Sequence, residues 1–152
     1  FGPNEYHKKD MQSMVRKGFL QVRDAGALNL FKSYKAGYGD GEQERDFLYV
    51  RDAVAMTLFF LENEGIGGIY NVGSGKARNW NDLASAIFKA MNKQMEINYI
   101  EMPESIRGQY QYHTCAEMEK IRSAGYMETT VSLEEGISDY VKNYLIPDKH
   151  LG

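Results

Sequence analysis

Segments of helical period alternate with short runs of strand character along this chain, and this alternation limits its fold more than any other feature. The clearest segment is 80–91, where apolar residues recur at i, i+3, i+4, i+7, i+8 and i+11, the pattern of a helix with one buried face. Similar periods predict a helix at 10–25, capped by Asp10 and stopped by Gly26, and another at 52–65. Such interleaving indicates an α/β or α+β domain with a small sheet.

Strands and the remaining helices are predicted from alternation and from capping signals. The runs that favour strands are 28–31, 46–50, 68–72 and 96–100. Two Ser/Thr-x-x-Glu boxes predict helices that begin at Thr114 and Ser132. The buried face of the last helix is expected to carry Leu133, Ile137, Tyr140, Val141 and Tyr144. In the 52–65 helix, Val54, Leu58 and Leu61 share one apolar stripe.

Composition excludes several classes of protein. At 152 residues one core is expected, and a net charge of −3 supplies no basic field for a nucleic acid. The longest apolar stretch, 53–61, is about half of the roughly 20 residues that a membrane span needs. The single cysteine, Cys115, fits a reducing cytoplasm. The three histidines lie far apart, so no metal site is expected.

The amino-terminal residues lack the features of a natural start. The chain begins Phe1-Gly2-Pro3, with no initiator Met, no basic segment and no apolar signal region. We therefore expect a piece of a longer protein.

Two glycine-rich stretches invite a phosphate-binding interpretation. Gly73-Ser74-Gly75-Lys76 misses the spacing of a P-loop, so a structural turn is favoured over a phosphate cradle. The glycines of 37–41 precede a strand, whereas a dinucleotide fingerprint follows one. The sequence thus predicts no cofactor-binding half in this chain.

Basic and aromatic side chains gather instead in the predicted loops. Arginine grips phosphate with two parallel hydrogen bonds, and aromatic faces suit a base or sugar. Loop residues are also the usual carriers of binding groups. We predict a seat for a nucleotide diphosphate formed by Lys8, Lys9, Lys32, Ser33, Tyr34, Lys35, Arg45, Arg107 and Tyr110.

At RDFLYVRDA (45–53) and YNVGSGKARNW (70–80), the chain resembles the carboxy-terminal part of extended short-chain dehydrogenase/reductases that act on nucleotide sugars. FGPNEYHK (1–8), the 30–50 stretch and the 103–126 stretch resemble the ADP-glyceromanno-heptose 6-epimerase family in particular. The resemblance implies a small α/β substrate-binding part with about five helices. It also implies that residues 1–152 form a nucleotide-sugar-binding domain and that the NADP-binding Rossmann domain is absent from this chain.

The resemblance assigns roles to matching positions. Lys8 matches a lysine that lies beside the nicotinamide and transfers protons opposite a tyrosine, so it is expected to be catalytic and cofactor-binding. Arg45 matches a diphosphate contact. The other substrate-binding positions that match are Phe31, Lys32, Ser33, Tyr34 and Tyr110.

Two positions depart from the family pattern. Asp10 stands where the family commonly has a small residue, and its carboxylate would repel a diphosphate unless it caps the helix. Lys17 stands where a histidine commonly faces the sugar nucleotide, and it could also serve an anion. Both remain substrate-binding candidates, and both leave the exact sugar open.

The implied reaction inverts a carbinol carbon, C6 of an ADP-linked heptose, by hydride removal to NADP and return to the other face. Two acid/base groups on opposite faces suit that plan. This chain alone is expected to be inactive, and the intact protein is expected to be a homo-oligomer in the cytoplasm. The alternatives are a UDP- or dTDP-sugar 4-epimerase or 4,6-dehydratase and a non-catalytic nucleotide-sugar-binding module.

Overall fold

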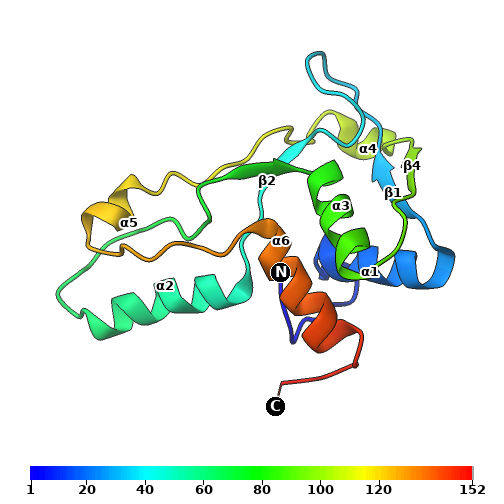
Figure 1. Ribbon diagram of the computed structural model, residues 1–152. Helices are drawn as coiled ribbons and strands as arrows, with labels where there is room; N and C mark the ends of the chain where they lie inside the picture. The colour runs from blue at the N-terminus through cyan, green and yellow to red at the C-terminus, as the bar shows by residue number, and fades with distance from the viewer. Residues whose placement is uncertain (152) are drawn as a thin grey trace.

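The computed structural model describes residues 1–151 and consists of short strands interleaved with helices (Figure 1). The predicted α/β class is confirmed. In chain order the elements are η1 (Tyr6–Met11, a 3₁₀ helix), α1 (Met14–Ala25), β1 (Leu28–Phe31), β2 (Glu44–Asp46), α2 (Val50–Glu62), β3 (Ala77–Asn79), α3 (Trp80–Ala90), β4 (Ile97–Ile100), α4 (Glu104–Arg107), α5 (Glu119–Ser123), α6 (Leu133–Tyr140) and η2 (Val141–Leu145, a π-helical turn).

The predicted small sheet is divided into two strand pairs. β1 and β4 run parallel, with Leu28 opposite Ile97. β2 and β3 run antiparallel, with Arg45 opposite Arg78. The second pair places β2 beside the start of α3, because β3 leads directly into that helix.

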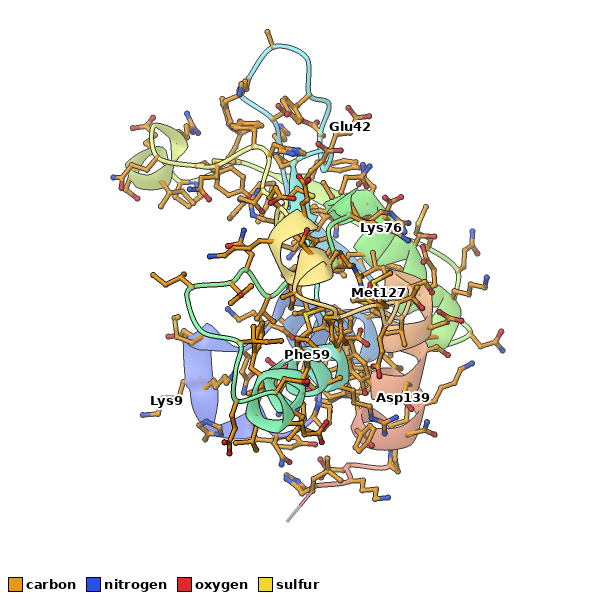
Figure 2. The ribbon with its side chains drawn as sticks, turned by 90° about the vertical axis from the view of Figure 1, so that its left-hand side faces the viewer. Lys9, Glu42, Phe59, Lys76, Met127 and Asp139 are labelled. Atoms are coloured by element: carbon orange, nitrogen blue, oxygen red, sulfur yellow. The ribbon has the colours of Figure 1, made fainter. Side chains whose placement is uncertain are left out.

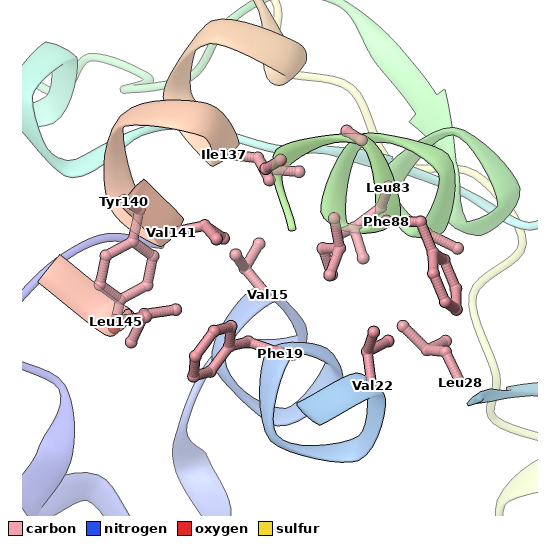
Figure 3. Packing of buried hydrophobic residues seen from close by; sticks show 14 of the residues in the cluster. Val15, Phe19, Val22, Leu28, Leu83, Phe88, Ile137, Tyr140, Val141 and Leu145 are labelled. Carbon is pink, nitrogen blue, oxygen red and sulfur yellow. The ribbon is translucent and has the colours of Figure 1, made fainter. Parts of the chain in front are cut away.

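The main core lies between α1, α3 and α6, and Figure 3 shows their apolar side chains meeting. Val15, Ile87 and Ile137 come from the three helices, and each is at most 1% exposed. Gly18 allows the close approach of α1, because a Cβ there would lie 2.7 Å from Leu28 Cδ1 and 2.8 Å from Ile87 Cδ1. A smaller cluster around Met56, Ile121 and Tyr126 joins α2 to the α5 region.

Helix ends confirm some of the capping predictions and correct others. The Ser132 side chain caps α6 in a reciprocal box with Glu135, and Gly26 ends α1 in the left-handed conformation. The start of α1 was predicted wrongly, since Ser13, not Asp10, accepts the first-turn N–H of Arg16. Asp10 lies in η1, so the predicted 10–25 helix is divided in two.

Three other predictions of secondary structure are wrong. The 46–50 strand is replaced by β2, which ends at Asp46, and α2 already begins at Val50. Residues 68–72 pair with no strand in the described chain 1–151. No helix begins at Thr114, because the Ala116 N–H donates to Asp46 and the Glu117 carboxylate accepts from the Glu119 N–H at the start of α5.

The two predicted apolar stripes differ in their exposure to solvent. The five residues predicted for the buried face of the last helix are all buried. The α2 stripe faces solvent, with Val54, Leu58 and Leu61 exposed by 50%, 45% and 72%. Within residues 1–151 we find no helix with the length and apolar character that a membrane crossing requires.

Candidate functional site

Three adjoining pockets run beside α1 and the two strand pairs. The first, the aromatic pocket, has a volume of about 350 Å³. It lies between β1, the amino-terminal end of α3 and the segment after α4. Its lining residues are Met14, Gln21, Asn29, Leu30, Phe31, Trp80, Ile100 and Tyr110.

The second and third pockets continue the first. The arginine pocket, of about 420 Å³, shares Met14 and Trp80 with the aromatic pocket and adds Arg45. The lysine pocket, of about 340 Å³, borders the arginine pocket at Ser13 and contains Lys8. We call the three together the trough. It contains four of the residues singled out from the sequence: Lys8, Phe31, Arg45 and Tyr110.

Aromatic side chains form the wall of the aromatic pocket. Phe31 meets Tyr110 edge-on at 6.3 Å between ring centroids, and Tyr112 supports the other side of Tyr110 at 5.6 Å. The Trp80 indole Nε1–H donates to the Tyr110 hydroxyl at 3.1 Å. The wall is therefore apolar with one hydroxyl at its edge, which suits a flat ring that carries polar substituents.

Arg45 lies where the aromatic and arginine pockets meet. Its guanidinium carbon is 5.0 Å from the centroid of the Tyr110 ring and 5.9 Å from that of Trp80. Its Nη1 donates to the Glu44 carbonyl at 2.7 Å. Among residues 1–151 no carboxylate forms an ion pair with it, whereas Arg78, opposite it in the ladder, pairs with Asp82 and Glu134. Arg45 therefore keeps donors for an anion.

Lys8 belongs to η1 and lines the lysine pocket with an exposed side chain. The segment is held by Glu5, which is 3% exposed. The Glu5 carboxylate accepts hydrogen bonds from the Ser13 hydroxyl and the Tyr140 hydroxyl, at 2.6 and 2.9 Å. Burial, and then the negative charge of Glu5, raises the pKa of Tyr140. This network ties the Lys8 segment to α1 and α6.

The loop after β1 places its predicted site residues outside the trough. Lys32 pairs with Glu101 at 2.7 Å, a hydrogen bond that raises the pKa of Lys32. The Ser33 N–H donates to Asp40 at 2.7 Å. The ring of Tyr34 lies 3.9 Å from the Arg107 guanidinium. None of the three predicted residues lines the trough.

Asp10 and Lys17 also lie apart from the trough. The Lys17 ammonium donates to the Asp10 carbonyl, and the Asp10 side chain is exposed and caps no helix. Lys9, which also lies in η1, is at the periphery of the molecule (Figure 2) and has a φ of 46°.

The Gly73-Ser74-Gly75 turn binds a carboxylate of the chain itself. Asp46 accepts from the Ser74 N–H at 2.7 Å and from the Gly75 and Ala116 N–H groups at 3.0 Å each. The backbone N–H groups that a phosphate would use are thus occupied by Asp46. The structural interpretation of this turn is confirmed.

Sequence reasoning missed Trp80 as a site residue. Its place in the 80–91 period assigned it to the helix core, yet it is only half-buried and lines two pockets. The available signal was its position directly after the Asn79 cap, since the first turn of a helix borders the preceding loop. Among the described residues 1–151, no group of three or more His, Cys, Asp or Glu side chains is arranged to hold a metal ion.

Comparisons with known proteins identify relatives of the chain. The model of the NAD dependent epimerase/dehydratase family matches residues 1–73. ADP-L-glycero-D-manno-heptose-6-epimerase of Nitratidesulfovibrio vulgaris (strain DP4) is 48% identical over 145 residues, which are 95% of this chain and 45% of that protein. The enzyme of the same name from Fusobacterium nucleatum is 48% identical over 151 residues, 95% of this chain and 46% of that protein.

Solved structures share the fold. The Helicobacter pylori ADP-L-glycero-D-manno-heptose-6-epimerase superposes with a TM-score of 0.75 at 30% identity, covering 94% of this chain and 41% of that one. The UDP-N-acetylglucosamine 4-epimerase of Methanobrevibacter ruminantium gives 0.78 at 20% identity, covering 98% and 44%, a likeness of fold alone. The chain thus spans less than half the length of the curated relatives it matches. On this evidence, residues 1–73 match the NAD dependent epimerase/dehydratase family, and nearly the whole chain is similar in sequence and fold to part of the heptose 6-epimerases.

Proposed function

We propose that this chain is the substrate-binding part of a nucleotide-sugar epimerase that acts on an ADP-linked heptose. The observation that carries the proposal is the position of Arg45, without a carboxylate partner among residues 1–151, between two aromatic rings at the junction of two pockets. The 48% identity to heptose 6-epimerases over nearly the whole chain supports the choice of substrate.

The three pockets suggest how such a ligand is divided. The aromatic pocket suits the base, because Phe31 and Tyr110 provide apolar surface with a hydroxyl at its edge. Arg45 suits the diphosphate, which accepts the parallel hydrogen bonds of a guanidinium. The sugar would then extend toward the lysine pocket, where Lys8 is available for proton transfer.

The described residues do not fit the main binding site of a nicotinamide cofactor, which the name of the matching family implies. The Gly73-Ser74-Gly75 turn is filled by Asp46, and the glycines of 37–41 lie in the loop that precedes β2, the reverse of a dinucleotide fingerprint. We therefore propose that a separate Rossmann domain holds the cofactor, as NADP, and that Lys8 faces it. The chain alone should not turn over substrate.

Two exposed features support docking of that domain. Residues 68–72 expose Ile69 by 89% and Val72 by 44%, and their backbone pairs with no strand within residues 1–151. The exposed stripe of α2 adds Leu58 and Leu61. A segment without strand partners beside an exposed apolar helix face is the kind of surface that another domain would cover. The free, exposed Cys115 supports a cytoplasmic location.

Trp80 offers a direct test, because it is the only tryptophan in the chain. Titration with ADP-glucose should change its fluorescence saturably. Arg45→Ala should weaken binding about tenfold or more, the loss expected for hydrogen bonds to a charged group. Arg23→Ala, which removes the same charge from an exposed end of α1, should leave binding unchanged.

Parallel titrations separate the alternatives. Tighter binding of UDP-glucose or dTDP-glucose than of ADP-glucose would favour a 4-epimerase or 4,6-dehydratase. A saturable response to no nucleotide sugar would contradict the proposed site. Equal binding by wild type and Arg45→Ala would remove Arg45 from it.

A further inference from the structure

We propose that Trp80 is a positioning residue that sets the direction of the Arg45 guanidinium and of the Tyr110 hydroxyl in the trough. This inference rests on the proposed function and deepens it. Nothing in the sequence pattern assigned Trp80 to the site.

Trp80 contacts both groups. Its Nε1–H donates to Tyr110 at 3.1 Å, and its ring centroid lies 5.9 Å from the Arg45 guanidinium carbon. Phe47 packs edge-on against it at 5.0 Å. Because the indole lines both the aromatic and the arginine pocket, its orientation affects the contacts of a ligand in either one.

The Trp80 backbone is itself firmly held. Asn79 and Asp82 form a reciprocal capping box at the start of α3, and the Arg78 guanidinium donates to Asp82 at 2.9 Å and to Glu134 at 2.6 Å. Trp80 is therefore the first residue of a helix that is fixed to β3 and to α6. A rotamer held by such a frame loses little further entropy when a ligand binds.

The hydrogen bond from Trp80 has a chemical consequence for Tyr110. Since the tyrosine oxygen accepts the indole N–H, its own hydroxyl hydrogen is left to donate elsewhere. A ribose or phosphate oxygen in the trough is the kind of acceptor it would meet. The aromatic rings beside Arg45 likewise restrict the plane of its guanidinium, a geometry that lysine could not reproduce.

A double-mutant cycle measures the coupling by calorimetric titration with ADP, which needs no fluorescence from Trp80. Trp80→Phe keeps an aromatic ring and removes the N–H, and Tyr110→Phe removes the hydroxyl. Each should weaken ADP binding about fivefold, and the double variant should bind about as the weaker single variant does, because both changes break one hydrogen bond. Tyr70→Phe, in the smaller cluster, should bind as wild type.

The outcomes distinguish the two proposals. Wild type that fails to bind ADP contradicts the proposed function. If wild type binds ADP but the losses of affinity from Trp80→Phe and Tyr110→Phe multiply in the double variant, the proposed role of Trp80 is overturned and the proposed function stands. A merely structural tryptophan would act independently of the Tyr110 hydroxyl. If Trp80→Phe does not fold, Arg45→Lys decides: affinity as weak as that of Arg45→Ala supports guanidinium positioning, and retained affinity overturns it.

Discussion

At the scale of single residues, two neighbours on β2 have opposite surroundings. Arg45 contacts aromatic rings and meets no carboxylate among residues 1–151, whereas Asp46 accepts four hydrogen bonds from the 74–75 turn and Ala116. Neighbouring strand residues point to opposite faces. The Arg45 guanidinium therefore lies beside the aromatic rings, whereas Asp46, which also lines the arginine pocket, binds the 74–75 turn.

Asp46→Asn should lower the free energy of unfolding by about 2 to 3 kcal/mol, because an amide leaves N–H donors of the turn unsatisfied. Urea unfolding followed by circular dichroism measures this. Asp10→Asn, at an exposed position, is the control and should change stability by less than about 0.5 kcal/mol. Equal stability of both variants would show that an amide serves the turn as well as the carboxylate does.

At the scale of elements, Arg78 joins β3 to α6. Its guanidinium donates to Glu134 at 2.6 Å, and this hydrogen bond lowers the pKa of Glu134. A carboxyl with a lowered folded pKa stabilises the protein above its unfolded pKa and loses that contribution as the pH falls through the folded value. The link between β3 and α6 should therefore weaken in acid.

Glu134→Gln tests this dependence. At pH 7 the variant should be less stable by about 0.5 to 1 kcal/mol, a value limited by the exposure of both side chains. The difference from wild type should shrink as the pH falls below about 4.3, the ordinary pKa of glutamate. Urea unfolding at pH 7 and pH 3.5 measures it, with Glu104→Gln, 90% exposed, as the control. A difference independent of pH would contradict the assignment.

Elements fixed by local signals could be predicted from the sequence, and elements fixed by distant partners could not. The Ser132 box and the period of 80–91 gave α6 and α3 nearly to the residue, since caps and periods act within one turn. The 68–72 strand was wrong because a strand needs a neighbour. The Thr114 start was wrong because Asp46, far away in sequence, binds the Ala116 N–H.

The candidate site follows the same division. The gathering of basic and aromatic residues in loops led to Arg45 and Tyr110, the family resemblance added Phe31, and the structure places all three along the trough. Lys32, Ser33 and Tyr34 were predicted from their place in the loop after a strand and from the family resemblance, but an ion pair, a turn contact and the Arg107 side chain hold them outside the trough. Trp80 was missed because periodicity shows which face of a helix is apolar but does not show whether a pocket borders the first turn.

At the scale of the whole molecule, two faces differ in character. α1, α3 and α6 enclose the main core, while α2 and the 68–72 segment expose apolar side chains to solvent. Apolar patches of this kind mark surfaces that associate with a partner. The stripe residues Val54, Leu58 and Leu61 do not line the trough, although Val50 and Ala53 of the same helix line its lysine pocket.

The chain should self-associate through this stripe at high concentration. Leu58→Glu combined with Leu61→Glu should shift sedimentation toward the monomer, because charges disfavour burial of the stripe. Met95→Glu, which alters an exposed apolar residue elsewhere, should leave the distribution as in wild type. If wild type sediments as a monomer at all concentrations, the α2 stripe does not mediate self-association.

A register error in the short pairing of β2 with β3 would have a large effect on the trough. Because side chains alternate along a strand, a shift of one position would exchange the two neighbours on β2. Asp46 would then take the place of Arg45 at the proposed diphosphate site, and Arg45 would face the backbone N–H groups of Ser74, Gly75 and Ala116. A register shift of one residue would thus place a negative charge where the proposed site needs a positive one. The three residue pairs of β2 and β3 therefore determine which charge an anionic ligand would meet.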